Sequence, residues 1–285
     1  MSIANEALST VRAPDAPGFT AVQGARCLLG RAALTWLMVT VAGQLIFSLY
    51  IALVYGGALV AGDTARWNHV MPRGYVAGDT AGNAALMTHV LIAVVIMTAG
   101  AFQLIPGIRR RMPVVHRWVG RSYMLSVILS SFAGLFLVWD RGAAARLSQH
   151  IAISLNAVII ICCALLAWRS ARARDFAEHR RWALRTFLAA SGVFFFRLGV
   201  FLWLMIHQRP LGFDAKTFAG PFLTALAFAV YVFVPLTVLQ GYFVAQEQQR
   251  VWWPRLMSVT LFALAALCAS GIASVTMMLW LPALR

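Results

Sequence analysis

Charged side chains are scarce in this sequence of 285 residues: only 12% are Asp, Glu, Lys or Arg, whereas 61% are hydrophobic. Soluble domains are about half apolar and about a quarter charged. The chain has more apolar surface than a water-facing protein of this length can bury. The composition excludes a soluble enzyme, a disordered regulator and a secreted scaffold, and it predicts an all-α polytopic membrane protein.

Lysine is almost absent, since 23 of the 24 basic residues are arginine and Lys216 is the exception. The arginines form short clusters between apolar runs, as in loops that orient a membrane protein during insertion. They do not form the continuous basic stripe that is typical of nucleic-acid binding. We therefore expect the lipid bilayer, and no nucleic acid, as a partner.

Several kinds of catalytic motif are missing as well. There is no Walker loop, no Cys-x-x-Cys, no His-Glu-x-x-His and no serine nucleophile elbow. No acidic residue lies within an apolar run, which argues against an antiporter with carboxylate relays. The four cysteines form no disulfide framework; Cys162, Cys163 and Cys268 lie in apolar runs, where thiols behave as small hydrophobes.

What is present is a series of seven apolar runs, each long enough for a membrane-spanning helix of about 20 residues. Arg31 and Asp63 bracket the first run and Asp79 and Arg109 the second, and the others are 122–139, 147–168, 186–208, 217–246 and 256–284. We expect residues 1–31 to form an N-terminal tail and residues 32–285 a single seven-span membrane domain. The loops are short, so any chemistry must take place within the helix bundle or at its two faces.

The basic residues also predict an orientation. Sixteen lie on the side of the N-terminus and seven on the other side. Because cytoplasmic loops carry the excess of Lys and Arg, the N-terminus is expected in the cytoplasm and the C-terminus outside. Abundant arginine, alanine and glycine with little lysine is typical of a GC-rich bacterial genome, so we expect the bacterial inner membrane.

Four of the six histidines follow a regular pattern along successive spans. His89 and His150 lie near the external starts of the second and fourth spans, whereas His116 and His179 lie at the cytoplasmic starts of the third and fifth. The two members of each pair are 61 and 63 residues apart, respectively. Similar His-Arg-Trp and His-Arg-Arg-Trp sequences follow the inner two. This indicates two repeated helical hairpins within residues 84–207.

Two such hairpins predict a central four-helix bundle, in which facing side chains meet in the core. His89 with His150, and His116 with His179, are then expected at similar depths, as two sites stacked across the membrane. An iron porphyrin needs one imidazole from each side of its plane, and two facing helices can supply them. The same pairs also suit another metal or a proton relay, and a histidine near a helix end is often only a polar anchor.

Arg197 is the one charged residue within a predicted span. It lies 18 residues after His179, or about 27 Å along a helix at 1.5 Å per residue. A charge at such a place is a functional candidate by default, here as a partner of a haem propionate. The other interpretation is a side chain that extends to the interface. Arg117, next to His116, is a second candidate for a propionate.

The residues that carry this pattern resemble a known family. Thr88-His89, Gln103, the arginine run 109–111 and the segments 116–123 and 179–182 are similar to an uncharacterised bacterial membrane family, domain of unknown function 2306, over roughly residues 84–207. In topology and histidine order the chain more distantly resembles the cytochrome b561 group. That resemblance implies an external haem b on His89 and His150 and a cytoplasmic haem b on His116 and His179.

The leading hypothesis is therefore a di-haem b protein that carries electrons across the bacterial inner membrane, between an unknown donor and an unknown acceptor. A small-solute or metal transporter is the first alternative, because transporters are also built from repeated hairpins. A structural or accessory subunit is the second.

Overall fold

The computed structural model describes residues 17–70, 74–142 and 146–284, and within them all regular elements are helices. Six helical segments are long and apolar enough to cross a membrane: Ala21–Val60, Thr80–Gln103, Pro113–Trp139, Leu147–Arg172, Pro221–Glu247 and Trp252–Leu284. A bent pair of helices, Phe176–Ala190 and Gly192–His207, provides a seventh crossing. The prediction of an all-α polytopic membrane protein is confirmed.

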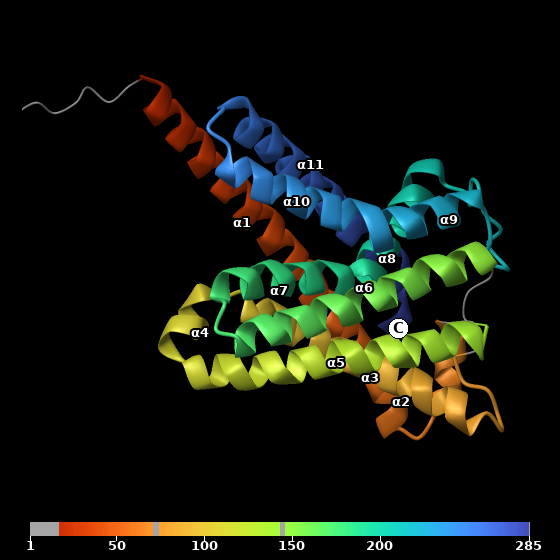
Figure 1. Cartoon of the computed structure of the whole chain (residues 1–285). Coiled ribbons are helices and arrows are strands. Elements are labelled where there is room, and N and C mark those ends of the chain that lie inside the picture. Colours follow the sequence, from red (N-terminus) through yellow and green to blue (C-terminus); the bar gives the residue numbers. More distant parts are fainter. Residues whose placement is uncertain (1–16, 71–73, 143–145, 285) are drawn as a thin grey trace, which may run out of the picture.

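Figure 1 shows the order and arrangement of these helices. In chain order they are α1 (Pro17–Ile51), η1 (Ala52–Gly56), α2 (Gly57–Val60), η2 (Thr64–His69), α3 (Thr80–Gln103), α4 (Pro106–Arg111), α5 (Pro113–Trp139), α6 (Leu147–Arg172), α7 (Phe176–Ala190), α8 (Gly192–His207), α9 (Pro221–Phe228), η3 (Ala229–Phe233), α10 (Val234–Glu247), α11 (Trp252–Val275), η4 (Thr276–Trp280) and η5 (Pro282–Leu284).

The first helix starts earlier than the sequence suggested. Helix α1 begins at Pro17, inside the segment expected to be a tail, and continues through η1 and α2 to Val60. Residues 1–16, the remainder of that expected tail, lie outside the described residues.

Helices α3, α5, α6 and α7 form the central bundle that the repeat predicts. Along the chain, α3 packs on α5, α5 on α6, and α6 on α7. All four contribute to one buried apolar cluster, which includes Ile96, Val127, Ile160 and Ala189. The cluster fixes the helices relative to one another and so determines where the histidines lie.

Helices α1, α8 and α11 pack together beside this bundle, with α9 and α10 next to them (Figure 1). Close approach of α1 to its neighbours depends on Gly43, where a Cβ atom would overlap the side chains of Ile272 and Phe194. Small residues at such crossings allow membrane helices to make the close van der Waals contacts that hold them together.

Several spans depart from regular α-helix: the first and last contain the π-helical turns η1 and η4, and the fifth and sixth are irregular near the bundle. The fifth bends by 43° between α7 and α8, at Ser191. The sixth contains the π-helical turn η3 just before Pro235, whose missing N–H removes one backbone hydrogen bond from the preceding turn. Such irregular turns persist in a membrane only where other groups satisfy the freed backbone atoms.

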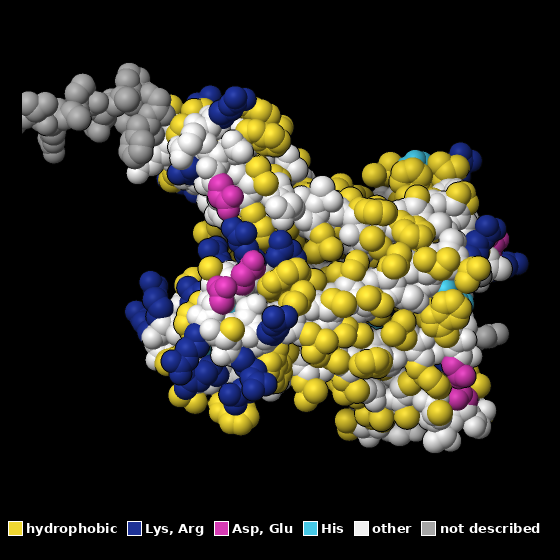
Figure 2. All heavy atoms as spheres, in the orientation of Figure 1, with side chains coloured by type: hydrophobic (Ala, Val, Ile, Leu, Met, Phe, Trp, Pro, Cys, Tyr) yellow, Lys and Arg dark blue, Asp and Glu magenta, His cyan; other side chains and the backbone are white. Residues whose placement is uncertain are grey.

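The surface agrees with a position in the bilayer. On the face drawn in Figure 2, hydrophobic side chains cover the middle of the molecule, and most of the Lys and Arg side chains gather at the end that carries α4. Large apolar side chains such as Leu125 and Val259 are about two-thirds exposed, which is stable only against lipid. We call the end with α4 the arginine-rich end.

Candidate functional site

The structure places the six candidate residues on the two repeated hairpins and their continuation. They are His89 on α3, His116 and Arg117 on α5, His150 on α6, His179 on α7 and Arg197 on α8. All four candidate histidines therefore belong to the central bundle.

His116 and His179 occupy equivalent positions at the arginine-rich end. Each is the fourth residue of its helix, α5 and α7 respectively, and both helices start at this end of the bundle (Figure 1). The charges of the two imidazoles lie within electrostatic range of each other. The structure thus places the two members of the expected inner pair at the same end of the bundle.

The hydrogen bond of His179 leaves one ring nitrogen for a ligand. Its Nδ1 lies 2.9 Å from the carbonyl oxygen of Ala167. A carbonyl only accepts, so Nδ1 carries a proton, and in the neutral tautomer that this bond selects Nε2 has the free lone pair. Histidines that bind a metal are commonly oriented in this way. In His116, Nδ1 is buried and has no hydrogen-bond partner among the described residues. A buried polar atom of this kind calls for an additional partner.

Arginines surround the inner pair, and some of them already have partners. Arg181 forms an ion pair with Glu247 at 2.7 Å, and Arg185 donates a hydrogen bond to Gln240. Arg117 is exposed and has neither a hydrogen bond nor an ion pair within the described part of the chain. Arg117 is therefore available to receive an anionic group beside His116.

His89 and His150 do not lie at the same depth, so the expected outer pair is not brought together. The Nδ1 of His89 lies 2.9 Å from the carbonyl oxygen of Ser130, whereas His150 packs edge-on against Trp139 with ring centroids 5.3 Å apart. Ser130 and Trp139 are nine residues apart on α5, or about 13 Å along the helix.

The difference in depth between His89 and His150 has a simple physical reason. Helix α3 begins at Thr80 and α6 at Leu147, so His89 is the tenth residue of its helix and His150 only the fourth. The prediction of equal depth treated both as lying near a span start. It overlooked the difference of six residues in their distance from that start.

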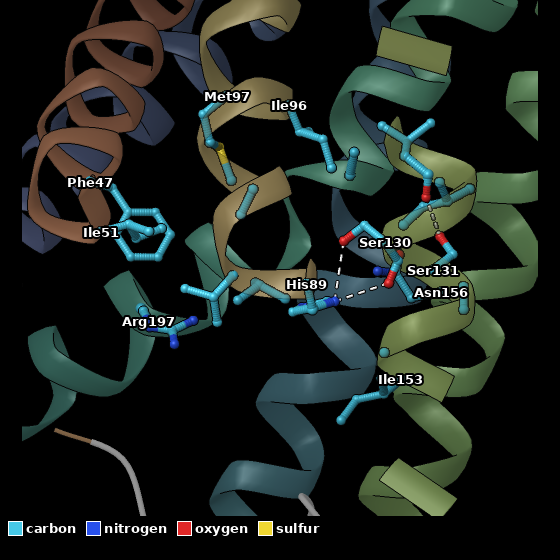
Figure 3. Close-up of a pocket in the computed structure, with 18 of the residues that line it drawn as sticks. Phe47, Ile51, His89, Ile96, Met97, Ser130, Ser131, Ile153, Asn156 and Arg197 are labelled. Carbon is cyan, nitrogen blue, oxygen red and sulfur yellow. Dashed lines mark hydrogen bonds between the residues drawn. The ribbon is translucent and has the colours of Figure 1, made fainter. Parts of the chain in front are cut away.

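A cavity of about 130 Å³ lies beside His89 (Figure 3). Most of its lining is apolar, but polar side chains reach it from several helices, among them His89 from α3, Ser130 and Ser131 from α5, Asn156 from α6 and Arg197 from α8. The hydroxyl-bearing side chains of Tyr50 and Tyr55 line it as well. His150 is not part of the lining. The structure therefore places His89 and Arg197 at the same cavity and leaves His150 outside it.

The size of the cavity limits what it can hold. Pockets for drug-sized ligands and cofactors usually have volumes of about 300–1,000 Å³, whereas an apolar cavity of about 150 Å³ accommodates benzene. A porphyrin does not fit beside His89, and His150 is too far along the helix axis to serve as the second axial ligand. The residues present do not suit an outer haem.

A site for a bare metal ion is not formed either. Among residues 17–70, 74–142 and 146–284, no group of three or more His, Cys, Asp or Glu side chains is placed to hold a metal. Zinc sites in proteins have three or four protein ligands. A haem iron differs because the porphyrin fills four positions and the protein supplies only two, which is what the inner pair offers.

Sequence reasoning missed two residues of the cavity. The backbone carbonyl of Ser130 binds the His89 ring. On α5, Ser130 follows His116 by twice seven residues, so Ser130 and His116 lie on the same face of that helix. That spacing was a usable signal. Asn156 also lines the cavity, and its place beside His89 follows from packing that the sequence does not reveal.

The chain was compared with known proteins. A family model described as "Predicted membrane protein (DUF2306)" matches residues 86–235, which is more than half of the chain. The chain belongs to this family. The match confirms the resemblance seen in the sequence, and it covers α5, α6, α7, α8 and most of α3. All six candidate residues of this DUF2306 protein lie within it. No curated protein and no solved structure matches the chain.

Proposed function

We propose that the chain is a haem b protein of the bacterial inner membrane, which binds one haem between His116 and His179. The observation that supports this most is the placement of the two imidazoles at equivalent positions of two parallel helices, at one end of the bundle. Ligation by two histidines requires one nitrogen on each side of the porphyrin plane. The haem would supply one-electron chemistry to a membrane electron carrier.

The neighbouring residues have distinct roles in this proposal. The Ala167 carbonyl orients the His179 ring so that Nε2 is the ligating atom. Arg117 receives a haem propionate, because a guanidinium binds a carboxylate through two parallel hydrogen bonds. The exposed arginines around the site also attract an anionic electron donor or acceptor.

The proposal is narrower than the hypothesis from the sequence, which had two haems and electron transfer across the membrane. The different depths of His89 and His150 along α5 argue against a second haem, so electrons are proposed to enter and leave at the arginine-rich end. We also propose that this end faces the cytoplasm, because it carries the larger share of the basic residues.

The test is a reduced-minus-oxidised absorption spectrum and a pyridine haemochrome assay on the purified full-length chain, expressed with haem available. We expect about one haem b per chain, with the bands of a low-spin iron. His116→Ala and His179→Ala should each abolish these bands, while gel filtration and thermal unfolding show a folded protein.

Two further histidines serve as controls. His69→Ala changes an exposed residue of η2, and His150→Ala removes the histidine that packs on Trp139; both variants should keep the full haem content. A folded protein without haem would overturn the proposal. A haem content that falls by half in His150→Ala would restore the two-haem hypothesis and contradict the narrower one.

A further inference from the structure

Arg197 carries a positive charge within the membrane and has no carboxylate partner among the described residues. The ion pairs described are Arg141–Asp79 and Arg181–Glu247, and neither involves a residue of the cavity. The guanidinium lies over the ring of Phe47, 5.2 Å from its centroid. An aromatic face offsets part of the cost of the charge, but it does not neutralise it.

The charged group lies at a cavity rather than in packed protein. Figure 3 shows Arg197 and His89 on the wall of the same cavity, with Phe47 and Ile51 on the side of Arg197. Ile153, Ile160, Val127 and other apolar groups form most of the remaining wall. The combination selects for a ligand with one anionic group and a small apolar body.

Part of the cavity wall comes from irregular segments of the chain. Ala190 and Val193, on either side of the bend between α7 and α8, both line the cavity. The π-helical turn η1 brings Tyr55 into the wall. Turns of this kind cost backbone hydrogen bonds and are frequent at functional sites.

We propose that this cavity binds a small monocarboxylate whose apolar body is no larger than one six-membered ring. The carboxylate lies on the Arg197 guanidinium, and the apolar body occupies the space between Arg197 and His89. The proposed function assigns no ligand to this place, and the inner histidine pair takes no part in it, so either proposal can fail without the other.

A carboxylate on Arg197 has two conceivable sources: a free small acid, or a propionate of a haem held on the outer side of the bundle. The cavity volume of about 130 Å³ favours the free acid, because it matches one ring and not a porphyrin. The experiment distinguishes the two sources.

The probe is benzoate, with benzyl alcohol as the neutral molecule of similar shape. Binding to the purified full-length chain in detergent is measured by equilibrium dialysis, together with the shift in the thermal unfolding temperature. We expect saturable binding of about one benzoate per chain, and binding of benzyl alcohol weaker by at least about tenfold, since charge-assisted hydrogen bonds are the stronger ones.

Three variants locate the bound molecule. Arg197→Gln should weaken benzoate binding by about tenfold or more, whereas Arg209→Gln, an exposed arginine just beyond α8, should leave it unchanged. Ala157→Leu fills the cavity from a buried position in its wall. It should abolish benzoate binding while the protein stays folded, so the proposal remains testable even if Arg197→Gln does not fold.

The opposite results are equally specific. Equal binding of benzoate and benzyl alcohol, or unchanged benzoate binding in folded Arg197→Gln or Ala157→Leu, would overturn the proposal. So would the absence of saturable benzoate binding. A second haem that is present in the wild-type chain and lost in Arg197→Gln would assign the carboxylate to a propionate and overturn it as well.

Discussion

Asp79 joins the loop before α3 to the bundle through two interactions at once. Its carboxylate accepts a hydrogen bond from the Gly82 backbone N–H at 2.8 Å, as the N-cap of α3, and it lies 3.3 Å from the guanidinium of Arg141. The Arg141 side chain is only 7% exposed. Asp175 provides a natural comparison, because it caps α7 through the Glu178 N–H and forms no ion pair with another described residue.

Replacing these two caps should therefore have different effects. Asp175→Ala should lower the free energy of unfolding by about 1 kcal/mol, the usual cost of a lost N-cap. Asp79→Ala should cost about 3 kcal/mol or more, because a buried arginine also loses a carboxylate. Thermal and denaturant unfolding of the purified variants measures the difference. Equal losses for the two variants would show that the Arg141 contact contributes nothing.

The positions of His116 and His179 along their helices could be predicted because they depend on local sequence. His116 and His179 follow repeated patterns at the starts of two helices, and a helix start fixes depth within a few ångströms. Arg197 was recognised for a different reason, as a charge in an apolar run. Its neighbours Phe47 and Asn156 come from distant parts of the chain, and nothing local indicates that they meet there.

At the scale of elements, the bend between α7 and α8 is held by side-chain amides. With its amide oriented so that the nitrogen donates, Asn156 binds the carbonyl oxygens of Tyr231 at 2.9 Å and Ala189 at 3.2 Å. Gln44 on α1 donates to the Ser191 hydroxyl at 2.8 Å, and that hydroxyl donates to the Phe187 carbonyl. Both amides thus support a bend that lies beside the cavity.

The Asn156 and Gln44 amides should contribute differently to the free energy of unfolding. Asn156→Leu would leave two backbone carbonyls without their donor, and we expect a loss of about 2–3 kcal/mol in unfolding free energy. Gln44→Leu should cost less than about 1 kcal/mol: the Ser191 hydroxyl keeps its bond to Phe187, and the Gln44 Oε1 is already buried without a partner among the described residues. Thermal unfolding of both variants in the same detergent measures the contrast, and a larger loss for Gln44→Leu would contradict it.

The bend was not predictable from the sequence, although the span containing it was. Residues 186–208 form one apolar run without proline, and the Ser191-Gly192 pair inside it permits a kink without requiring one. The bend instead accompanies contacts with Gln44 on α1 and Asn156 on α6. The turn before Pro235 differs, because proline itself removes the backbone donor.

At the scale of the whole molecule, seven crossings place the start of α1 and the end of η5 at opposite ends (Figure 1). Sixteen basic residues against seven should direct the arginine-rich end to the cytoplasm during insertion. Arg26 lies at this end and donates a hydrogen bond to the carbonyl oxygen of Gln248 at 3.0 Å. The start of α1 and the loop before α11 should therefore be on the same side of the membrane.

Reporter fusions in a bacterial host test this orientation. Alkaline phosphatase fused after Arg285 should be active, and a green fluorescent protein at the same place should be dark, because only the phosphatase folds after export through the general secretion pathway. Fusions after Ala173, in the loop between α6 and α7, should give the reverse pattern and serve as the control. A fluorescent fusion after Arg285 together with an active phosphatase after Ala173 would show that the topology is the opposite of the one expected. The inner histidine pair would then face the outside, and its electron partner would have to be sought there.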